Sequence, residues 1–130
     1  MSTFVQRYLL LFLFLGITLA QASEVFSIKI EPSKKTYQVG ETLKGEVVID
    51  NDYPATLPAV FEMKLYHNGR LETESQMSVK DLPPGRLPFT FEAFRIPEKL
   101  FQKEDLGTWE IVVNQLHSEK LSRVKFEVIE

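Results

Sequence analysis

Cysteine is absent from the 130 residues of this sequence. Its absence excludes disulfide bonds, thiolate catalysis, cysteine-ligated zinc and the lipid-modified cysteine of bacterial lipoproteins. The sequence also contains no Asn-x-Ser/Thr sequon and no G-x-S-x-G motif. Hydrophobic packing must therefore hold the core together, and the sequence supplies 10 Phe, 4 Tyr and 1 Trp for that purpose.

An excess of positive charge is missing as well. Lys and Arg number 15 against 18 Asp and Glu, which gives a formal net charge of −3, with both signs interspersed along the chain. Surfaces that bind nucleic acids normally carry a basic patch. The charge balance therefore predicts no nucleic-acid partner.

The longest hydrophobic run is Tyr8–Ala20, which follows Arg7 and leads into Ala20-Gln21-Ala22. This order of a basic residue, an apolar run and small residues is typical of a secretory signal peptide. The run is shorter than the roughly 20 residues needed to cross a membrane, so no stable membrane anchor is expected after cleavage. We predict a signal peptide over residues 1–22 and a secreted or periplasmic protein.

Residues 23–130 have the length of one domain with one core. From Val25 onward, apolar and polar residues alternate, and Gly, Pro, Asn and Asp interrupt the alternation at short intervals. The strands that this pattern predicts begin near residues 26, 43, 60, 70, 87, 107 and 124. Short strands at this spacing are typical of immunoglobulin-like domains. We predict an all-β fold, a seven-stranded antiparallel immunoglobulin-like β-sandwich.

The dipeptide Asn68-Gly69 is the strongest hairpin signal in the chain. Both residues tolerate positive φ, which a type I′ turn requires. The segment Val60–His67 is therefore predicted to pair antiparallel with Arg70–Val79. The returning strand is mostly polar, which predicts a position at the edge of a sheet.

The segment that follows Pro97 is the longest irregular stretch. Good helix formers over Glu98–Lys103 predict one or two turns of helix at most. The preceding strand is expected to run up to Pro97, which cannot donate a hydrogen bond to a neighbouring strand. In such a strand, Phe94 falls on the face opposite Phe91.

This connection is also the predicted surface for a partner protein. Interfaces favour aromatic residues together with Arg. The candidate partner-binding residues are Phe94, Arg95, Leu100 and Phe101. In the alternative interpretation, the crossover folds over an open end of the sandwich and buries these side chains.

Several segments resemble known families. Thr36–Gly45 resembles the Y-x-x-G-E-x-(V/L)-x-G entry to the second strand of macroglobulin-like domains of the alpha-2-macroglobulin and complement type, and of arrestin amino-terminal domains. Gly107–Val113 and Lys125–Ile129 resemble the ending of macroglobulin-like domains, G-x-(Y/W)-x-(I/L)-x-V followed by F-x-V. Leu82–Pro97 is similar to the arrestin pattern L-P-x-G, F-x-F and L-P. The resemblance implies a sandwich fold and a role in adhesion or interaction.

No catalytic, cofactor-binding or metal-binding residues are predicted. His67 and His117 lie beside predicted hairpin turns, with no further ligands close in sequence. The acidic turn Asp50-Asn51-Asp52 offers oxygen ligands for calcium, but such residues also favour turns through their own hydrogen bonds. We expect a protein that is not an enzyme and uses no cofactor, and calcium binding at the acidic turn stays open.

These observations together predict a non-catalytic protein-binding module that acts through a sheet edge or its loops. The edge Arg70–Lys80 is suited to accept a strand from a partner protein. Two further hypotheses stay open. One is a small secreted protease inhibitor that uses Leu82–Leu87 or Glu98–Leu106, and the second is a calcium- or carbohydrate-dependent adhesion domain that uses Trp109 or the tyrosines.

The predicted export can be tested on the whole chain. Expression in a secretion host is expected to release a chain that begins at Ser23, and Ala22→Arg is expected to leave residues 1–22 attached, because the cleavage site requires small residues. Gln21→Arg is the matched control, since the middle position of the site accepts any residue. Intact-mass spectrometry distinguishes the two forms, and an unprocessed wild-type chain kept inside the cell would contradict the prediction.

Overall fold

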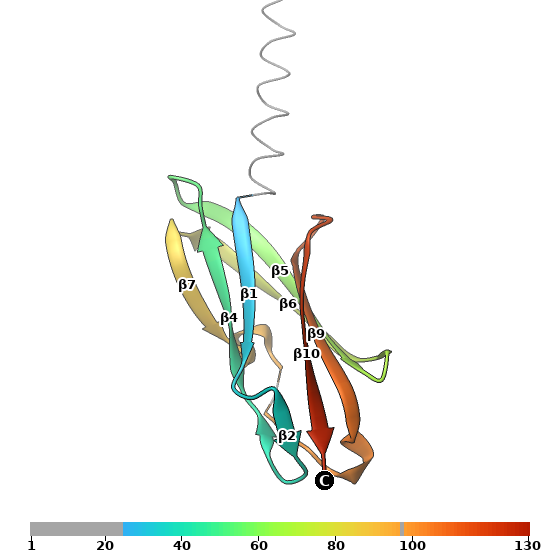
Figure 1. Cartoon of the computed structure of the whole chain (residues 1–130). Helices are drawn as coiled ribbons and strands as arrows, with labels where there is room; N and C mark the ends of the chain where they lie inside the picture. Colours follow the sequence, from blue (N-terminus) through green and yellow to red (C-terminus); the bar gives the residue numbers. More distant parts are fainter. Residues whose placement is uncertain (1–24, 97) are drawn as a thin grey trace, which may run out of the picture.

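The structure is a computed structural model that describes residues 25–96 and 98–130, so the predicted signal peptide lies outside the described residues. Two sheets face each other across one core (Figure 1). The smaller sheet contains, in spatial order, β1 (Phe26–Pro32), β4 (Gly45–Asn51) and β7 (Gly85–Thr90). The larger sheet contains, in spatial order, β2 (Thr36–Gln38), β10 (Leu121–Ile129), β9 (Gly107–Gln115), β5 (Leu57–His67) and β6 (Arg70–Leu82).

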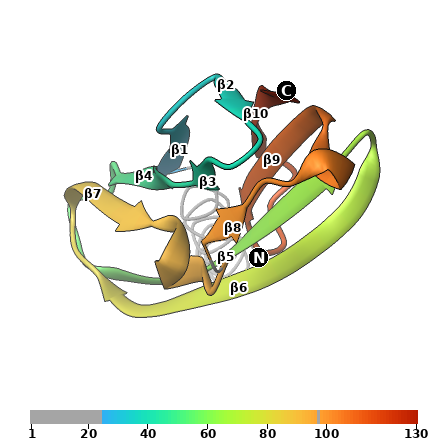
Figure 2. The ribbon, with the colours of Figure 1, turned by 90° about the horizontal axis from the view of Figure 1, so that it is seen from below.

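Four short elements connect the sheets at one end of the sandwich (Figure 2). A two-stranded pair joins β3 (Thr42–Leu43) to β8 (Lys99–Leu100). The 3-10 turns are η1 (Phe91–Phe94) and η2 (Lys103–Asp105). No helix within residues 25–96 and 98–130 is long and apolar enough to cross a membrane.

The predicted all-β sandwich is confirmed. All seven strands of six residues or more pair antiparallel, and they are the strands that the alternating pattern predicts. The short strand β2 was not predicted, and it runs parallel to β10. In β5, for example, Phe61, Met63 and Leu65 are buried, whereas Glu62 and Lys64 between them are partly exposed.

Two valines interrupt the polar outer faces of the sheets and are nevertheless buried. Val48 in β4 is 3% exposed and lies between Lys29 and Pro88 on the neighbouring strands. Val112 in β9 is 6% exposed and lies between Lys64 and Arg123. The aliphatic stems of long basic side chains cover apolar neighbours while the charges stay in water.

The predicted hairpin between β5 and β6 is confirmed. Asn68 has a φ of 49° and Gly69 a φ of 84°, as a type I′ turn requires. The Asn68 side-chain oxygen accepts a hydrogen bond from the Thr108 N–H (3.0 Å), and the Asn68 N–H donates to the Thr108 carbonyl (2.8 Å). The hairpin is thereby tied to the start of β9.

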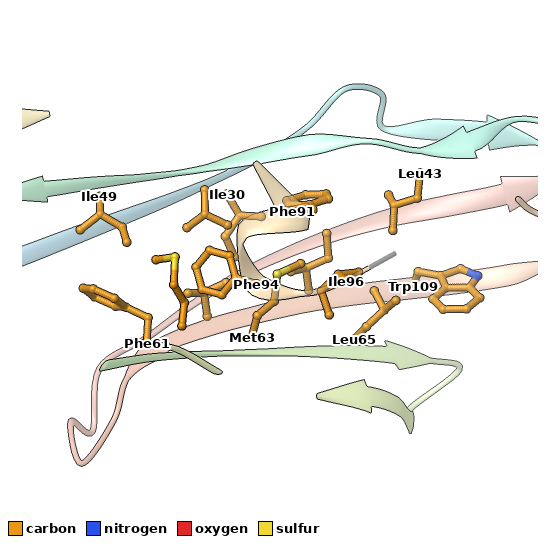
Figure 3. Packing of buried hydrophobic residues seen from close by; sticks show 14 of the residues in the cluster. Ile30, Leu43, Ile49, Phe61, Met63, Leu65, Phe91, Phe94, Ile96 and Trp109 are labelled. Carbon is orange, nitrogen blue, oxygen red and sulfur yellow. The ribbon is translucent and has the colours of Figure 1, made fainter. Parts of the chain in front are cut away.

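The crossover between β7 and β9 differs from the prediction. β7 ends at Thr90, and Arg95 adopts a left-handed conformation with a φ of 57°. The chain turns inward there, so the prediction that Phe94 faces away from Phe91 is wrong, and both rings are buried. Figure 3 shows Phe91, Phe94 and Ile96 between side chains of the two facing sheets.

The predicted helix over Glu98–Lys103 is also wrong. The Phe101 N–H donates to the Glu41 carbonyl (2.9 Å), and the Gly40 N–H donates to the Phe101 carbonyl (2.8 Å). These bonds extend the pairing of β3 with β8. Backbone pairing with a distant segment therefore prevails over the local preference for a helix.

Phe101 lies in an aromatic cluster at this end of the core. Its ring centroid is 5.2 Å from that of Tyr37, 5.9 Å from that of Phe126 and 5.7 Å from that of Trp109. All four rings are at most 1% exposed. Leu100, the preceding residue, is 52% exposed.

The contrast between these neighbours gives a stability prediction. Phe101→Ala is expected to lower the free energy of unfolding by about 3–5 kcal/mol, because it leaves a cavity among packed rings. Leu100→Ala is expected to change it by at most about 0.5 kcal/mol, as is usual for exposed sites. Denaturant unfolding followed by tryptophan fluorescence measures both, and equal losses would contradict the burial of Phe101.

Candidate functional site

The two sheets have four edge strands, and three of them are short, covered or interrupted. β1 lies beside β10, where the Ser122 hydroxyl donates to the Ile28 carbonyl (2.8 Å). β7 carries Pro88, which has no N–H to offer a neighbouring strand. β2 has three residues. β6 differs from all of these, because it has 13 residues and no proline.

The direction of the backbone groups along β5 follows from one hydrogen bond. The Leu116 N–H donates to the Val60 carbonyl (2.8 Å), which therefore faces β9. Backbone groups alternate between the two sides of an antiparallel strand. Phe61, Met63 and Leu65 consequently direct their N–H and C=O groups toward β6.

The register between β5 and β6 then identifies the free backbone groups of β6. The residues opposite Phe61, Met63 and Leu65 are, in turn, Met77, Ser75 and Thr73. The intervening residues Glu74, Gln76 and Ser78 point their N–H and C=O groups away from β5. In the described part of the chain, no hydrogen bond reaches these outward groups.

The side chains of this free edge are polar and carry opposite charges at its two ends. Glu74, Gln76, Ser78 and Lys80 are all exposed. The pairing with β5 shifts by one residue between Tyr66 and Leu65, so Glu72 lies in a bulge. The regular edge therefore begins after the bulge and ends near Lys80, and we call residues 74–80 the β6 edge.

The crossover places the four predicted partner-binding residues in two environments. Phe94 and Phe101 are 0% and 1% exposed, so their rings offer no surface to a partner. For these two residues, the alternative interpretation applies, in which the crossover folds over an open end of the sandwich and buries their side chains. Arg95 and Leu100 are exposed, and their contact with a partner stays a prediction.

A groove of about 410 Å³ lies between the start of β6 and the crossover. Leu65, Ile96 and Trp109 form its floor and are each at most 4% exposed. Leu100 lies on its rim beside exposed polar side chains, which are Glu72, Glu98 and Gln102. The groove thus combines an apolar floor with a polar rim, as binding sites commonly do.

A buried carboxylate holds one wall of this groove in place. Asp105 is 7% exposed, and its carboxylate accepts a hydrogen bond from the Gln102 N–H (2.8 Å) and pairs with the Lys99 ammonium (3.3 Å). The Asp105 carbonyl accepts a hydrogen bond from the Trp109 indole N–H (2.7 Å). The Lys99 ammonium lies 5.5 Å from the centre of the Trp109 ring, within range of a cation–π interaction.

The sequence pattern did not lead us to predict this cluster. The available signal was the spacing Gln102-x-x-Asp105, in which an acidic side chain reaches back to cap the start of a turn. His67 completes the cluster by stacking on Trp109, with ring centroids 4.4 Å apart and planes at 13°. Its Nε2–H donates to the Leu106 carbonyl (2.8 Å), so His67 acts as a packing residue here.

The acidic turn is organised by hydrogen bonds of its own. Asn51 is 3% exposed, its amide nitrogen donates to the Ala55 carbonyl (3.2 Å) and the Leu82 carbonyl (3.0 Å), and its oxygen accepts from the Tyr53 N–H (3.0 Å). Among residues 25–96 and 98–130, no three His, Cys, Asp or Glu side chains lie close enough to hold a metal ion. The described residues therefore contain no cluster of such ligands that would support the calcium hypothesis.

The segments predicted to inhibit a protease are mostly exposed and are anchored by a few buried residues, whereas the tryptophan predicted to bind a sugar lies in the core. Leu82 is fully buried, and β7 begins at Gly85, so Pro83-Pro84 forms a short connection. Trp109 is 0% exposed and presents no face to a sugar ring. Protease inhibition stays a prediction, and carbohydrate binding stays a prediction that the burial of Trp109 does not favour.

Two surface ion pairs shift the pKa values of their members. The Lys34 ammonium and the Gln38 N–H bond to the Glu41 carboxylate and hold its pKa below the usual range. The Glu62 carboxylate raises the pKa of Lys64. Both are interactions between charges at the surface, where they adjust the local field and do not create a desolvated acid or base.

No protein-family model matches the sequence, and no curated protein matches it. Solved structures share the fold. The chain is similar to the CARDB domain of a Pyrococcus furiosus protein, solved in complex with di-metal ions, with a TM-score of 0.53 and 15% identity over 79% of this chain and 91% of that one. This likeness supports an immunoglobulin-like β-sandwich.

Parts of larger enzymes have the same arrangement of strands. One is a cycloisomaltooligosaccharide glucanotransferase from Paenibacillus sp., with a TM-score of 0.57 and 11% identity over 77% of this chain and 13% of that one. Another is the alkylpurine DNA glycosylase AlkC of Pseudomonas fluorescens, with a TM-score of 0.56 and 14% identity over 82% of this chain and 31% of that one. At these identities the likeness shows the fold alone.

The Asp105 cluster gives a second stability prediction. Asp105→Ala is expected to lower the free energy of unfolding by about 1–3 kcal/mol, because the partly buried Gln102 N–H loses its acceptor and Lys99 loses its partner. Asp105→Asn keeps an acceptor for the N–H and is expected to cost less. Urea unfolding of the three proteins measures the difference, and a loss for Asn as large as that for Ala would show that the charge, and not the hydrogen bond, stabilises the turn.

Proposed function

We propose that this chain is an exported, non-catalytic protein-binding module, formed by residues 23–130, that binds a partner by accepting a strand at the β6 edge. In strand addition, main-chain hydrogen bonds give affinity and alternate side chains give selectivity. In this proposal, cleavage after Ala22 releases the domain from its signal peptide during export.

The observation that supports strand addition is the row of unbonded backbone groups along the β6 edge. Proteins usually protect long edge strands, because a row of free N–H and C=O groups invites another strand. In this sandwich β1 is covered and β7 carries Pro88, whereas Glu74, Gln76 and Ser78 leave their backbone groups unbonded within the described residues. Strand addition would satisfy these groups.

The groove supports the same location. It borders β6 at Glu72 and Thr73, so a partner strand that extends past the bulge passes beside it. Leu100 on the rim gives such a segment an apolar contact, which retains one of the predicted partner-binding residues. Arg95 stays part of the proposal as an exposed charge on the crossover.

Binding without catalysis agrees with the chemistry of the described residues. The buried carboxylate of Asp105 is engaged by Lys99 and by a backbone N–H, and His67 is engaged by Trp109 and a backbone carbonyl. Groups held in this way stabilise structure. The resemblance to macroglobulin-like domains, which implies an interaction module, rests on Thr36–Gly45 and on the last two strands and stays part of the proposal.

The proposal predicts that one backbone N–H matters more than its side chain. Gln76→Pro removes an N–H that faces away from β5, so the sheet is expected to stay intact, because proline is tolerated on the free side of an edge strand. Partner binding is expected to fall by at least about tenfold, since the ring blocks strand pairing and removes a donor. Gln76→Ala, the matched control, keeps the N–H and is expected to bind like the wild type.

The measurement is affinity capture from the native exported fraction with the three tagged proteins, followed by hydrogen exchange at residues 74, 76 and 78 in the captured complex. Circular dichroism first establishes that Gln76→Pro is folded. Equal capture of the same partner by the folded Gln76→Pro protein would refute strand addition at this edge. Strand addition would also be refuted if no captured protein required the β6 edge for its binding.

A further inference from the structure

We infer that the partner strand at the β6 edge is the β6 edge of a second copy of this chain, so that two sandwiches join through one continuous sheet. The inference rests on the proposed strand addition and names the partner. Closed two-fold dimers are the commonest form of self-association, and they require a surface that is complementary to itself.

The charges of the β6 edge are complementary to themselves in an antiparallel register. When Gln76 of one copy lies opposite Ser78 of the other, Glu74 lies opposite Lys80, and the two-fold axis repeats both pairs. All four residues are exposed, and Glu74, Gln76 and Ser78 project their backbone groups away from β5. The register therefore joins the free donors and acceptors of Gln76 and Ser78 through about four main-chain hydrogen bonds, two for each of the two facing pairs, and places opposite charges beside each other at residues 74 and 80.

Two competing registers are worse by the same reasoning. Centring the axis on Glu74 places two carboxylates face to face, and centring it on Lys80 places two ammonium groups face to face. Like charges directly opposite each other are destabilising in a sheet, and opposite charges are favourable. A shift by one residue would place the free backbone groups of one copy opposite residues of the other copy whose groups are already bonded to β5.

The inner face of the edge fits this arrangement as well. Met77, which is 8% exposed, lies at the two-fold axis opposite its own copy, and Ser75 lies opposite Val79. Residues in such non-hydrogen-bonded pairs approach closely, and these side chains are uncharged. The inner face thus presents apolar and small polar side chains to one another, without burying a charge.

The bulge at Glu72 limits the pairing to one segment. An edge that stayed regular along its whole length would allow several registers and open-ended association. The irregular pairing before Thr73 and after Val79 leaves residues 73–79 as the regular part, with Lys80 directly after it. Because each copy has one such edge among the described residues, the pairing closes at two copies.

Charge reversal tests the inference directly on the chain purified after export. Wild-type protein is expected to be a dimer in sedimentation equilibrium, with amides 74, 76 and 78 protected from hydrogen exchange as concentration rises. Glu74→Lys and Lys80→Glu each place two like-charge pairs in the dimer and are expected to weaken it by about tenfold or more. An equimolar mixture of the two variants, and the double variant Glu74→Lys/Lys80→Glu, are each expected to restore dimers, the mixture as heterodimers resolved by native mass spectrometry.

The outcomes separate the inference from the proposed function. A wild-type chain that stays monomeric at millimolar concentration overturns the inference. A dimer that survives both single charge reversals overturns it as well, because its two copies would not be joined through their β6 edges in this register. Strand addition still stands in that case if Gln76→Pro abolishes capture of a different protein and Gln76→Ala does not. If Gln76→Pro affects neither dimer nor capture, both the inference and the proposed function fall.

Discussion

The crossover after β7 is the constraint on which the rest of the structure depends. Two sheets that share few connecting strands leave their core open on one side, and here Phe91, Phe94, Ile96 and Phe101 fill that opening from a single segment. Gly45 permits this, because a Cβ there would lie 2.6 Å from the Phe91 ring. Closure is therefore achieved with side chains, while the backbone edge of β6 stays unpaired.

Local alternation predicted the seven long strands and the β5–β6 hairpin because each strand has one face on the core, as Phe61, Met63 and Leu65 illustrate. The same reasoning failed at Phe94. A single residue in the left-handed conformation, Arg95, reverses the direction of the chain, and arginine carries no signal for that conformation. Alternation also cannot detect β8, which forms because of residues about 60 positions earlier in the sequence.

The candidate site was predicted only in part, because some of its features also depend on residues that are distant in the sequence. The polar composition of Arg70–Val79 marked an edge strand, and that assignment depends on composition alone. The outward direction of the backbone at Glu74, Gln76 and Ser78 depends on the register with β5, which depends in turn on the turn at Asn68-Gly69. The Asp105 cluster joins β8, η2 and β9 and needs the folded crossover before its members meet.

The four edges of this sandwich are protected to different degrees. A chain that needed only to remain monomeric would gain from a proline or an inward lysine on β6, as Pro88 interrupts β7. The β6 edge has neither, yet its bulge and its two opposite charges restrict which strand can pair with it and in what register. An edge whose charges disfavour some registers has one property that selective pairing needs, because specificity requires that competing arrangements be penalised.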